Sequence, residues 1–171
     1  EMLLHDLSVK GPSPYIYFQL GQNYISLNDM EKAAHYYKLG LDLNADPQSD
    51  FVQSMTETYG YCLMDLAKYD AAMSLQDKYE FFSHRADFVY LMGMLYLKKG
   101  EPKKALEEFK KATTLSSFSR KGVNSYRANY HIGAIYEDQK DFEQARIYYK
   151  KCGDYEPAAR RLRELSAVSA S

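Results

Sequence analysis

Apolar and polar residues alternate with helical spacing along most of the chain, and one pairing of two helices recurs. The clearest copy is residues 129–152, NYHIGAIYEDQKDFEQARIYYKKC, with an amphipathic helix on each side of Gln139-Lys140-Asp141. Three further segments have the same design around Gly21, Gly60 and Gly93. Because an apolar stripe at helical spacing is buried against another element, this pattern predicts helices packed in antiparallel pairs.

The anchor glycines Gly21, Gly60, Gly93 and Gly133 follow one another at intervals of 39, 33 and 40 residues. Twelve residues after each glycine stands an alanine: Ala33, Ala72, Ala105 and Ala145. Small residues on both helices allow a close crossing, so we expect a Cβ at each glycine to meet the facing backbone. A recurrence near 34 residues is typical of helix-turn-helix solenoids.

This pattern of glycine, large residue and alanine resembles the tetratricopeptide repeat family over roughly residues 14–166. The resemblance implies an all-α fold, a right-handed α-solenoid of about four helix-turn-helix repeats with a C-terminal capping helix. The predicted parts are a connector or end of a preceding helix at 1–13, a repeat array at 14–156 (repeats about 14–46, 47–83, 84–118 and 124–156), a capping helix at 157–166 and a flexible tail at 167–171. Residues 69–82 are predicted to form the second helix of repeat two, where Gln76 and Tyr79 depart from the family pattern.

By the same resemblance, residues three before, one after and four after each anchor glycine face a concave groove. These groove positions are Phe18, Gln22, Ile25, Glu57, Tyr61, Met64, Tyr90, Met94, Leu97, Tyr130, Ala134 and Glu137. They are mostly aromatic and apolar, with two acids and no lysine, which suits an amphipathic helix or an apolar peptide segment. The alternative is that these side chains contact neighbouring repeats or are covered by residues 1–13.

The composition mainly excludes certain kinds of partner and site. The 171 residues carry a net charge of −1, and lysine pairs are interleaved with acids, so no nucleic-acid partner is expected. Only Cys62 and Cys152 are present, without the spacing of a metal site, and buried reduced thiols are expected. We find no nucleotide-binding or nucleophile motif, no apolar run long enough for membrane insertion and no signal peptide, so no cofactor and a cytoplasmic location are expected.

These observations favour a non-catalytic module that binds a protein or peptide partner, or a second copy of the chain. Segments such as ADFVYLMGMLYLKKG and GVNSYRANYHIGAIYEDQKDFEQARIYYKKCGDYEPAARRL also resemble the repeat tails of bacterial family 2 glycosyltransferases. That resemblance implies a catalytic domain upstream of Glu1, in a longer parent protein. The alternative is a free-standing adaptor or regulatory protein with no attached enzyme.

Overall fold

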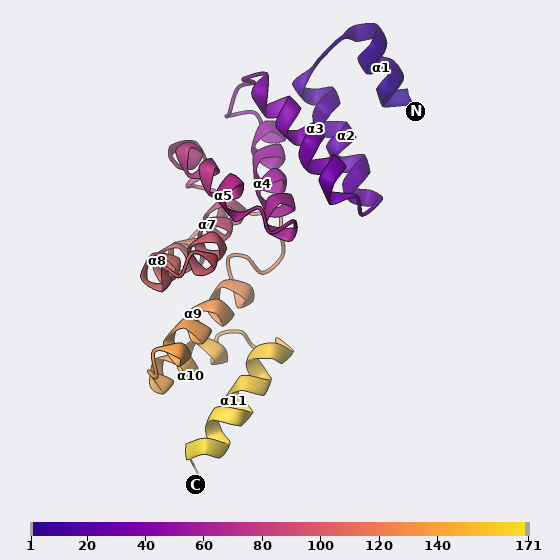
Figure 1. Ribbon diagram of the computed structural model, residues 1–171. Helices are drawn as coiled ribbons and strands as arrows, with labels where there is room; N and C mark the ends of the chain where they lie inside the picture. The colour runs from indigo at the N-terminus through magenta and orange to yellow at the C-terminus, as the bar shows by residue number, and fades with distance from the viewer. Residues whose placement is uncertain (1, 170–171) are drawn as a thin grey trace. The chain divides into compact units, whose positions relative to one another are not determined.

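The computed structural model describes residues 2–169, which fold as helices joined by short turns (Figure 1). Two compact units are present, Glu1–Phe82 and Ser83–Ser171. Within the described residues the only β-type pairing is a single bridge between Arg85 and Ser117. The predicted all-α class is therefore confirmed, while the continuity of the predicted array from 14 to 156 stays a prediction.

The first unit is built from two helix pairs and a short leading helix. Its elements are α1 (Met2–Lys10), α2 (Pro14–Ser26), α3 (Met30–Asp42), α4 (Asp50–Asp65), α5 (Tyr69–Met73), the 3₁₀ helix η1 (Ser74–Lys78) and α6 (Tyr79–Phe82). Helix α2 packs on α3, and α3 packs on α4. Pro14 lies in the first turn of α2, where its missing N–H is not needed, and the Asp29 carboxylate caps α3 by accepting from Lys32 N at 3.0 Å.

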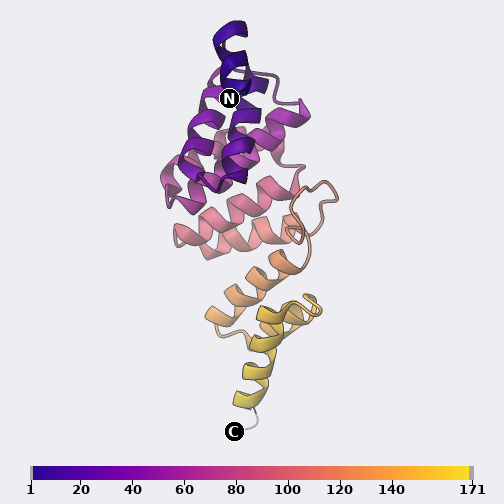
Figure 2. The same cartoon turned by 90° about the vertical axis from the view of Figure 1, so that its right-hand side faces the viewer.

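The second unit contains two further pairs and a final helix. Its elements are α7 (Ala86–Lys98), α8 (Pro102–Ala112), α9 (Tyr126–Asp138), α10 (Phe142–Lys150) and α11 (Glu156–Ser169). Consecutive helices contact one another throughout, and Figure 2 shows α7 and α8, in pink, side by side. Helix α11 extends beyond the predicted capping helix, because the predicted tail is helical through Ser169. Residues 170 and 171 lie outside the described residues.

Aromatic rings, not backbone, face the anchor glycines Gly21, Gly93 and Gly133. A Cβ built on Gly93 would lie 2.8 Å from Cε1 of Phe109, and one on Gly133 would lie 2.7 Å from Cδ1 of Tyr149. Both rings belong to the second helix of the pair and are buried. The expectation that a Cβ would meet the facing backbone is therefore wrong, because a ring sixteen residues after the glycine occupies that space.

Repeat two departs from the predicted helix at the corresponding position. Residues 69–82 are divided among α5, η1 and α6 instead of forming one helix. Gln76 stands sixteen residues after Gly60, where Tyr37, Phe109 and Tyr149 stand in the other repeats. A polar side chain in place of a buried ring removes the main apolar contact of the second helix, which accounts for the local change to 3₁₀ geometry.

The turns between paired helices share one backbone feature. The residue seven positions after each anchor glycine has a left-handed conformation, with φ of 58° at Asn28, 55° at Ala67, 73° at Gly100 and 63° at Lys140. A left-handed residue after a helix allows the chain to reverse and satisfy the last carbonyls. The same turn geometry therefore follows each of the four anchor glycines.

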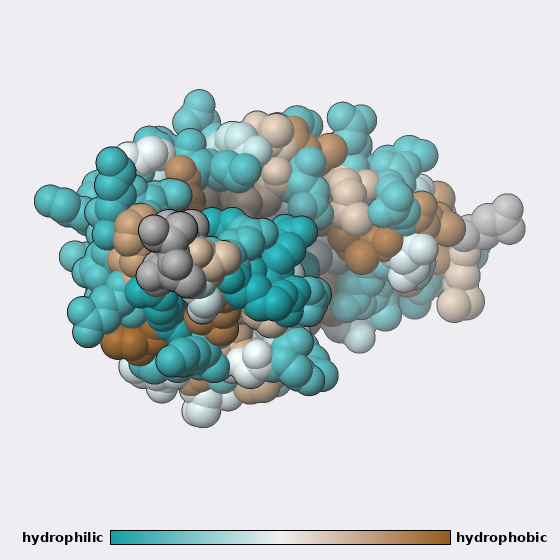
Figure 3. Space-filling model, turned by 90° about the horizontal axis from the view of Figure 1, so that it is seen from below, coloured by the Kyte–Doolittle hydropathy of each residue, from teal (hydrophilic) through white to brown (hydrophobic). Residues whose placement is uncertain are grey.

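On the face shown in Figure 3, hydrophilic residues predominate and hydrophobic residues gather in separate patches. Among the described helices, none combines the length and the apolar character needed to cross a bilayer.

Candidate functional site

In the first unit, the groove position Phe18 belongs to a cluster of aromatic rings with Tyr15 and Phe51. Phe18 lies with its ring centroid 5.9 Å from that of Phe51, and Tyr15 meets Phe51 edge-on at 5.4 Å. Phe18 also packs 6.4 Å from Tyr37, the ring that fills the space above Gly21. Tyr15 remains 50% exposed, so the cluster joins the buried core at one side and reaches solvent at the other.

The other groove positions of the first unit differ in their exposure. Ile25 is half-buried against the core cluster around Tyr37, and Tyr61 and Met64 on α4 are half-buried too. Gln22 is exposed, whereas Glu57 is buried with 3% of its surface exposed. The structure therefore leaves Phe18, Ile25, Tyr61 and Met64 partly accessible, and burial limits Glu57 to a supporting role.

In the second unit, Tyr90 belongs to the core and not to an open surface. Its hydroxyl lies 2.9 Å from Nε2 of His131, and its ring meets Phe109 edge-on at 5.4 Å. His131 stacks on Phe109 with an interplanar angle of 14°. Burial raises the pKa of Tyr90 to about 12 and lowers the pKa of His131 to about 4. Both groups are therefore neutral near pH 7. Met94 and Leu97 are half-buried one and two turns further along α7.

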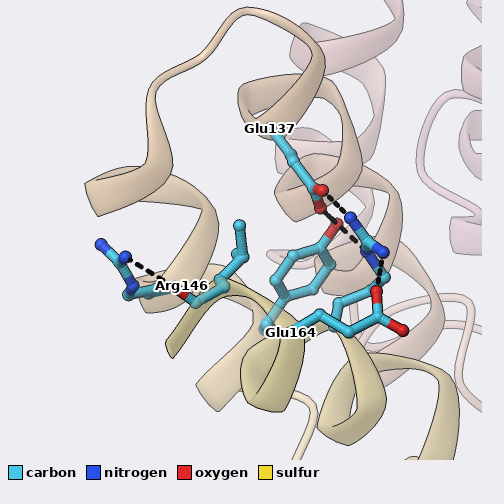
Figure 4. Close-up of polar contacts among 6 residues, drawn as sticks. Glu137, Arg146 and Glu164 are labelled. Carbon is cyan, nitrogen blue, oxygen red and sulfur yellow. Dashed lines mark hydrogen bonds and ion pairs between the residues drawn. The ribbon is translucent and has the colours of Figure 1, made fainter. Parts of the chain in front are cut away.

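In repeat four, the groove position Glu137 is engaged by the final helix. Tyr149 Oη donates to Glu137 Oε2 at 2.7 Å, and Arg161 Nε donates to the same oxygen at 3.2 Å. Arg161 also pairs with Glu137 Oε1 and with Glu164, so the arginine lies between two carboxylates (Figure 4). The hydrogen bond from Arg161 lowers the pKa of Glu137, and burial raises the pKa of Tyr149.

Apolar contacts hold α11 in the same place. Ala158 and Leu165 are buried in one cluster with Ala145 and Tyr149, and the Leu165 carbonyl accepts from Arg146 Nη2 at 3.2 Å (Figure 4). Tyr130 packs edge-on against Tyr155 at 5.7 Å and lies 5.8 Å from Tyr149. The half-buried Ala134 completes the groove positions of α9. Tyr130 and Glu137 are therefore contacted by α10 and by the chain that follows it, and not by residues 1–13.

Sequence reasoning missed the contacts that fasten the loop between α8 and α9. The buried Asp87 carboxylate accepts from Ser119 N at 2.7 Å and from Arg120 N at 2.8 Å. Arg85 donates to the hydroxyls of Ser117 and Ser119 at 3.2 and 2.8 Å. An Asp two residues into a predicted helix gives little local signal of such a contact, because its partners lie more than thirty positions later.

The described residues offer little redox or metal chemistry. No group of three or more metal-ligating side chains occurs in residues 2–169. Cys62 and Cys152 are both buried, as predicted. Burial raises the pKa of Cys152 to about 11, so its thiol is protonated near neutral pH.

Comparison with protein-family models agrees with the helix pairs. The tetratricopeptide repeat model matches residues 14–47, 86–118 and 126–158, which together exceed half of the chain. The chain belongs to the tetratricopeptide repeat family. The unmatched stretch includes α4 to α6, where the second helix of the tetratricopeptide repeat is broken. No curated protein sequence matches the chain.

Solved tetratricopeptide repeat structures have the same fold. A crystal structure of MamA has a TM-score of 0.74 at 23% identity, covering 93% of this chain and 87% of that one. MamA from Desulfovibrio magneticus RS-1 has a TM-score of 0.74 at 20% identity, over 91% and 82% of the two chains. YrrB, described as a TPR protein with an unusual peptide-binding site, has a TM-score of 0.71 at 19% identity, over 88% and 74%. As a tetratricopeptide repeat protein, the chain has the architecture of a protein-interaction scaffold.

Proposed function

We propose that the chain binds a peptide or an amphipathic helix of a partner protein through the first helices of its repeats. The observation that carries this proposal is the aromatic cluster of Tyr15, Phe18 and Phe51, which remains partly open to solvent in the first unit. Ile25, Tyr61 and Met64 extend this apolar character along α2 and α4. Because exposed aromatic and methionine side chains supply large contact areas with little polar desolvation, they suit an apolar helix face.

The partly accessible groove positions of the second unit belong to the same proposal. Met94 and Leu97 on α7 are half-buried and contain no charge. In contrast, Tyr90 is already paired with His131, and Glu137 is already paired with Arg161. We therefore assign binding to Met94 and Leu97 in the second unit, where Tyr90, Tyr130 and Glu137 have supporting roles. In the first unit we assign it to Phe18, Gln22, Ile25, Tyr61 and Met64, where Glu57 has a supporting role. YrrB, described as peptide-binding, supports this kind of partner.

A peptide-display selection on the 171-residue chain tests the proposal. Selected peptides should bind saturably in fluorescence anisotropy. Ile25→Glu and Met64→Glu should each weaken binding by about tenfold or more, since each places a charge where an apolar side chain of the peptide would pack. The matched control is Ile147→Glu on α10, where the isoleucine is 41% exposed on a second helix. Equal binding by the parent chain and both groove variants would contradict the assignment.

Two further expectations have their own measurements. Self-association would appear in light scattering as a dimer mass that Met94→Glu reduces, and a monomer at high concentration would count against it. Attachment to a family 2 glycosyltransferase rests on the resemblance of segments such as ADFVYLMGMLYLKKG. The open reading frame upstream of Glu1 decides between this arrangement and a free-standing cytoplasmic adaptor, since only the former encodes a sugar-nucleotide domain there.

A further inference from the structure

A cleft of about 570 Å³ opens in the first unit, away from the groove positions. Its walls come from the end of α3 and the loop after it, from the first half of α4, and from η1 and α6. Two sequence features create it. Helix α4 begins ten residues before its anchor glycine, against seven for α2, α7 and α9, and the second helix of repeat two breaks at Ser74. The longer α4 thus projects beyond the broken helix, whose 3₁₀ turn and α6 form the opposite wall.

The cleft and the groove use different faces of α4. Val52, Met55 and Tyr59 line the cleft at helical spacing, whereas Glu57, Tyr61 and Met64 occupy the groove positions. At about 100° per residue, the two stripes point roughly 160° apart around the helix axis. Binding in the cleft is therefore independent of the groove, and each can be tested without the other.

The chemistry of the lining is apolar with balanced charges. Val52, Met55 and Leu75 are buried apolar side chains of the walls, and Phe81 stands 49% exposed beside them. The charged lining residues are two lysines and two aspartates, and Lys38 Nζ already bonds both oxygens of Asp42 at 2.7 and 2.8 Å. A lining with no net charge offers no preference for a charged ligand. A volume between about 300 and 1,000 Å³ is usual for small-molecule sites.

Tyr59 supplies a phenol hydroxyl to the lining of the cleft. It is half-buried, and the charges of Lys38 and Asp42 act on it. Burial raises the pKa of Tyr59, so this hydroxyl stays a neutral donor and acceptor at physiological pH. Nearby hydroxyls are already used, since Thr56 donates to Val52 O at 2.8 Å and Ser74 donates to Ala71 O at 2.6 Å. Among the hydroxyls of the lining, that of Tyr59 can therefore fix the orientation of an apolar ligand.

We propose that this cleft binds a neutral aromatic group that carries one hydroxyl, with the ring against the half-exposed Phe81 and the hydroxyl bonded to Tyr59. Aromatic rings pack favourably against one another at such surfaces. The charges of the lining balance, so neither sign of ligand charge is favoured. The same chemistry is supplied by a free aromatic alcohol or by a tyrosine side chain of a partner polypeptide.

Titration of the ¹⁵N-labelled 171-residue chain with 4-methylphenol, toluene and N-acetyl-tyrosinamide tests the site. Saturable 4-methylphenol binding should shift amides of residues 44–59 and 74–82. Ser74→Trp, which fills the cleft from its rim, should abolish binding. Tyr59→Phe should weaken the binding of 4-methylphenol about three- to tenfold, because the hydrogen bond is lost. The affinity for toluene, which has no hydroxyl, should not change. The matched control is Tyr36→Phe on α3, outside the cleft. It should change the affinity for neither ligand.

The N-acetyl-tyrosinamide arm distinguishes the source of the ring. Tighter binding of the amide than of 4-methylphenol assigns the site to a tyrosine of a polypeptide, and weaker binding assigns it to a free aromatic alcohol. Non-saturable shifts with all three probes, or equal losses in Tyr59→Phe and Tyr36→Phe, would overturn the site. Far-UV circular dichroism and thermal melts of each variant establish that the fold is retained in these comparisons.

Discussion

Gly93 on α7 and Phe109 on α8 fit together so closely that a single methyl group does not fit between them. A Cβ at Gly93 would approach Cε1 of Phe109 to 2.8 Å and Cδ1 to 2.9 Å. The Phe109 ring is fully buried, with Tyr90 and His131 packed against it. Because its neighbours hold the ring on other sides, it cannot move aside without disturbing α9 as well as α7.

Gly93→Ala should therefore destabilise the protein by about 1–3 kcal/mol, the usual cost of overpacking a core. Phe109→Leu removes the ring that the new methyl group would meet. In that background we expect Gly93→Ala to cost clearly less, and the difference is the coupling between the two positions. Urea unfolding of the parent, both single variants and the double variant measures this coupling. An equal cost of Gly93→Ala in both backgrounds would contradict the packing described.

The helix pairs were predictable because their signals are local and repeated. Each anchor glycine and the alanine twelve residues later stand at fixed spacing, and all four alanines are fully buried. The ring sixteen residues after the glycine was equally visible as Tyr37, Phe109 and Tyr149, and would have corrected the expectation of a backbone contact. Its replacement by Gln76 is also the sequence signal for the broken helix in repeat two.

The exposure of the groove positions was not predictable from spacing alone. Tyr90 is buried because His131, forty-one residues later, reaches its hydroxyl, and Glu137 is covered because Arg161 of α11 bonds it. Helical periodicity states which face of a helix a residue occupies. It does not state which later element covers that face, since this depends on contacts between distant segments.

The left-handed turn residues give a second prediction. Ala67 has φ of 55° in the turn between α4 and α5, where Gly100 occupies the same position between α7 and α8. A non-glycine residue in this conformation costs about 1 kcal/mol, so Ala67→Gly should stabilise the protein by about 0.5–1 kcal/mol. The control is Ala71→Gly in α5, which should destabilise by about 0.5–1 kcal/mol because glycine weakens a helix interior. Thermal and urea melts measure both, and destabilisation by Ala67→Gly would contradict the turn geometry.

The reactivity of Cys152 provides a third prediction. With its pKa raised to about 11, the thiol is roughly one part in 3,000 thiolate at pH 7.5, against about one part in ten for an ordinary cysteine. In a Cys62→Ala background, 5,5′-dithiobis(2-nitrobenzoate) should therefore react about a hundredfold or more slowly with the native protein than with the urea-unfolded chain. The native rate should keep rising with pH beyond 9. A plateau near pH 8.5 in the native state would contradict the burial of this thiol.

The contact between Glu137 and Arg161 predicts a dependence of stability on pH. Because the pKa of Glu137 is lower in the folded protein than in the unfolded chain, the unfolded chain binds more protons in acid. The stabilisation by this carboxylate is thus present above its unfolded pKa of about 4.3 and is lost as the pH falls through the folded pKa. Glu137→Gln should cost about 1 kcal/mol at pH 7, a value reduced for the partial exposure of Arg161.

The cost of Glu137→Gln should begin to shrink as the pH falls below about 4.3 and should approach zero once the pH lies below the lowered folded pKa, because the parent carboxyl is then neutral too. The matched control is Glu156→Gln, which breaks the pair of Glu156 with Arg163 on the surface of the same helix. Both partners of that pair are well exposed, so we expect a cost below about 0.5 kcal/mol with little change between pH 7 and 3. Urea unfolding of the parent and the two variants at several pH values measures these differences. A cost of Glu137→Gln that stays constant with pH would show that the glutamate acts through its shape and hydrogen bonds, not through its charge.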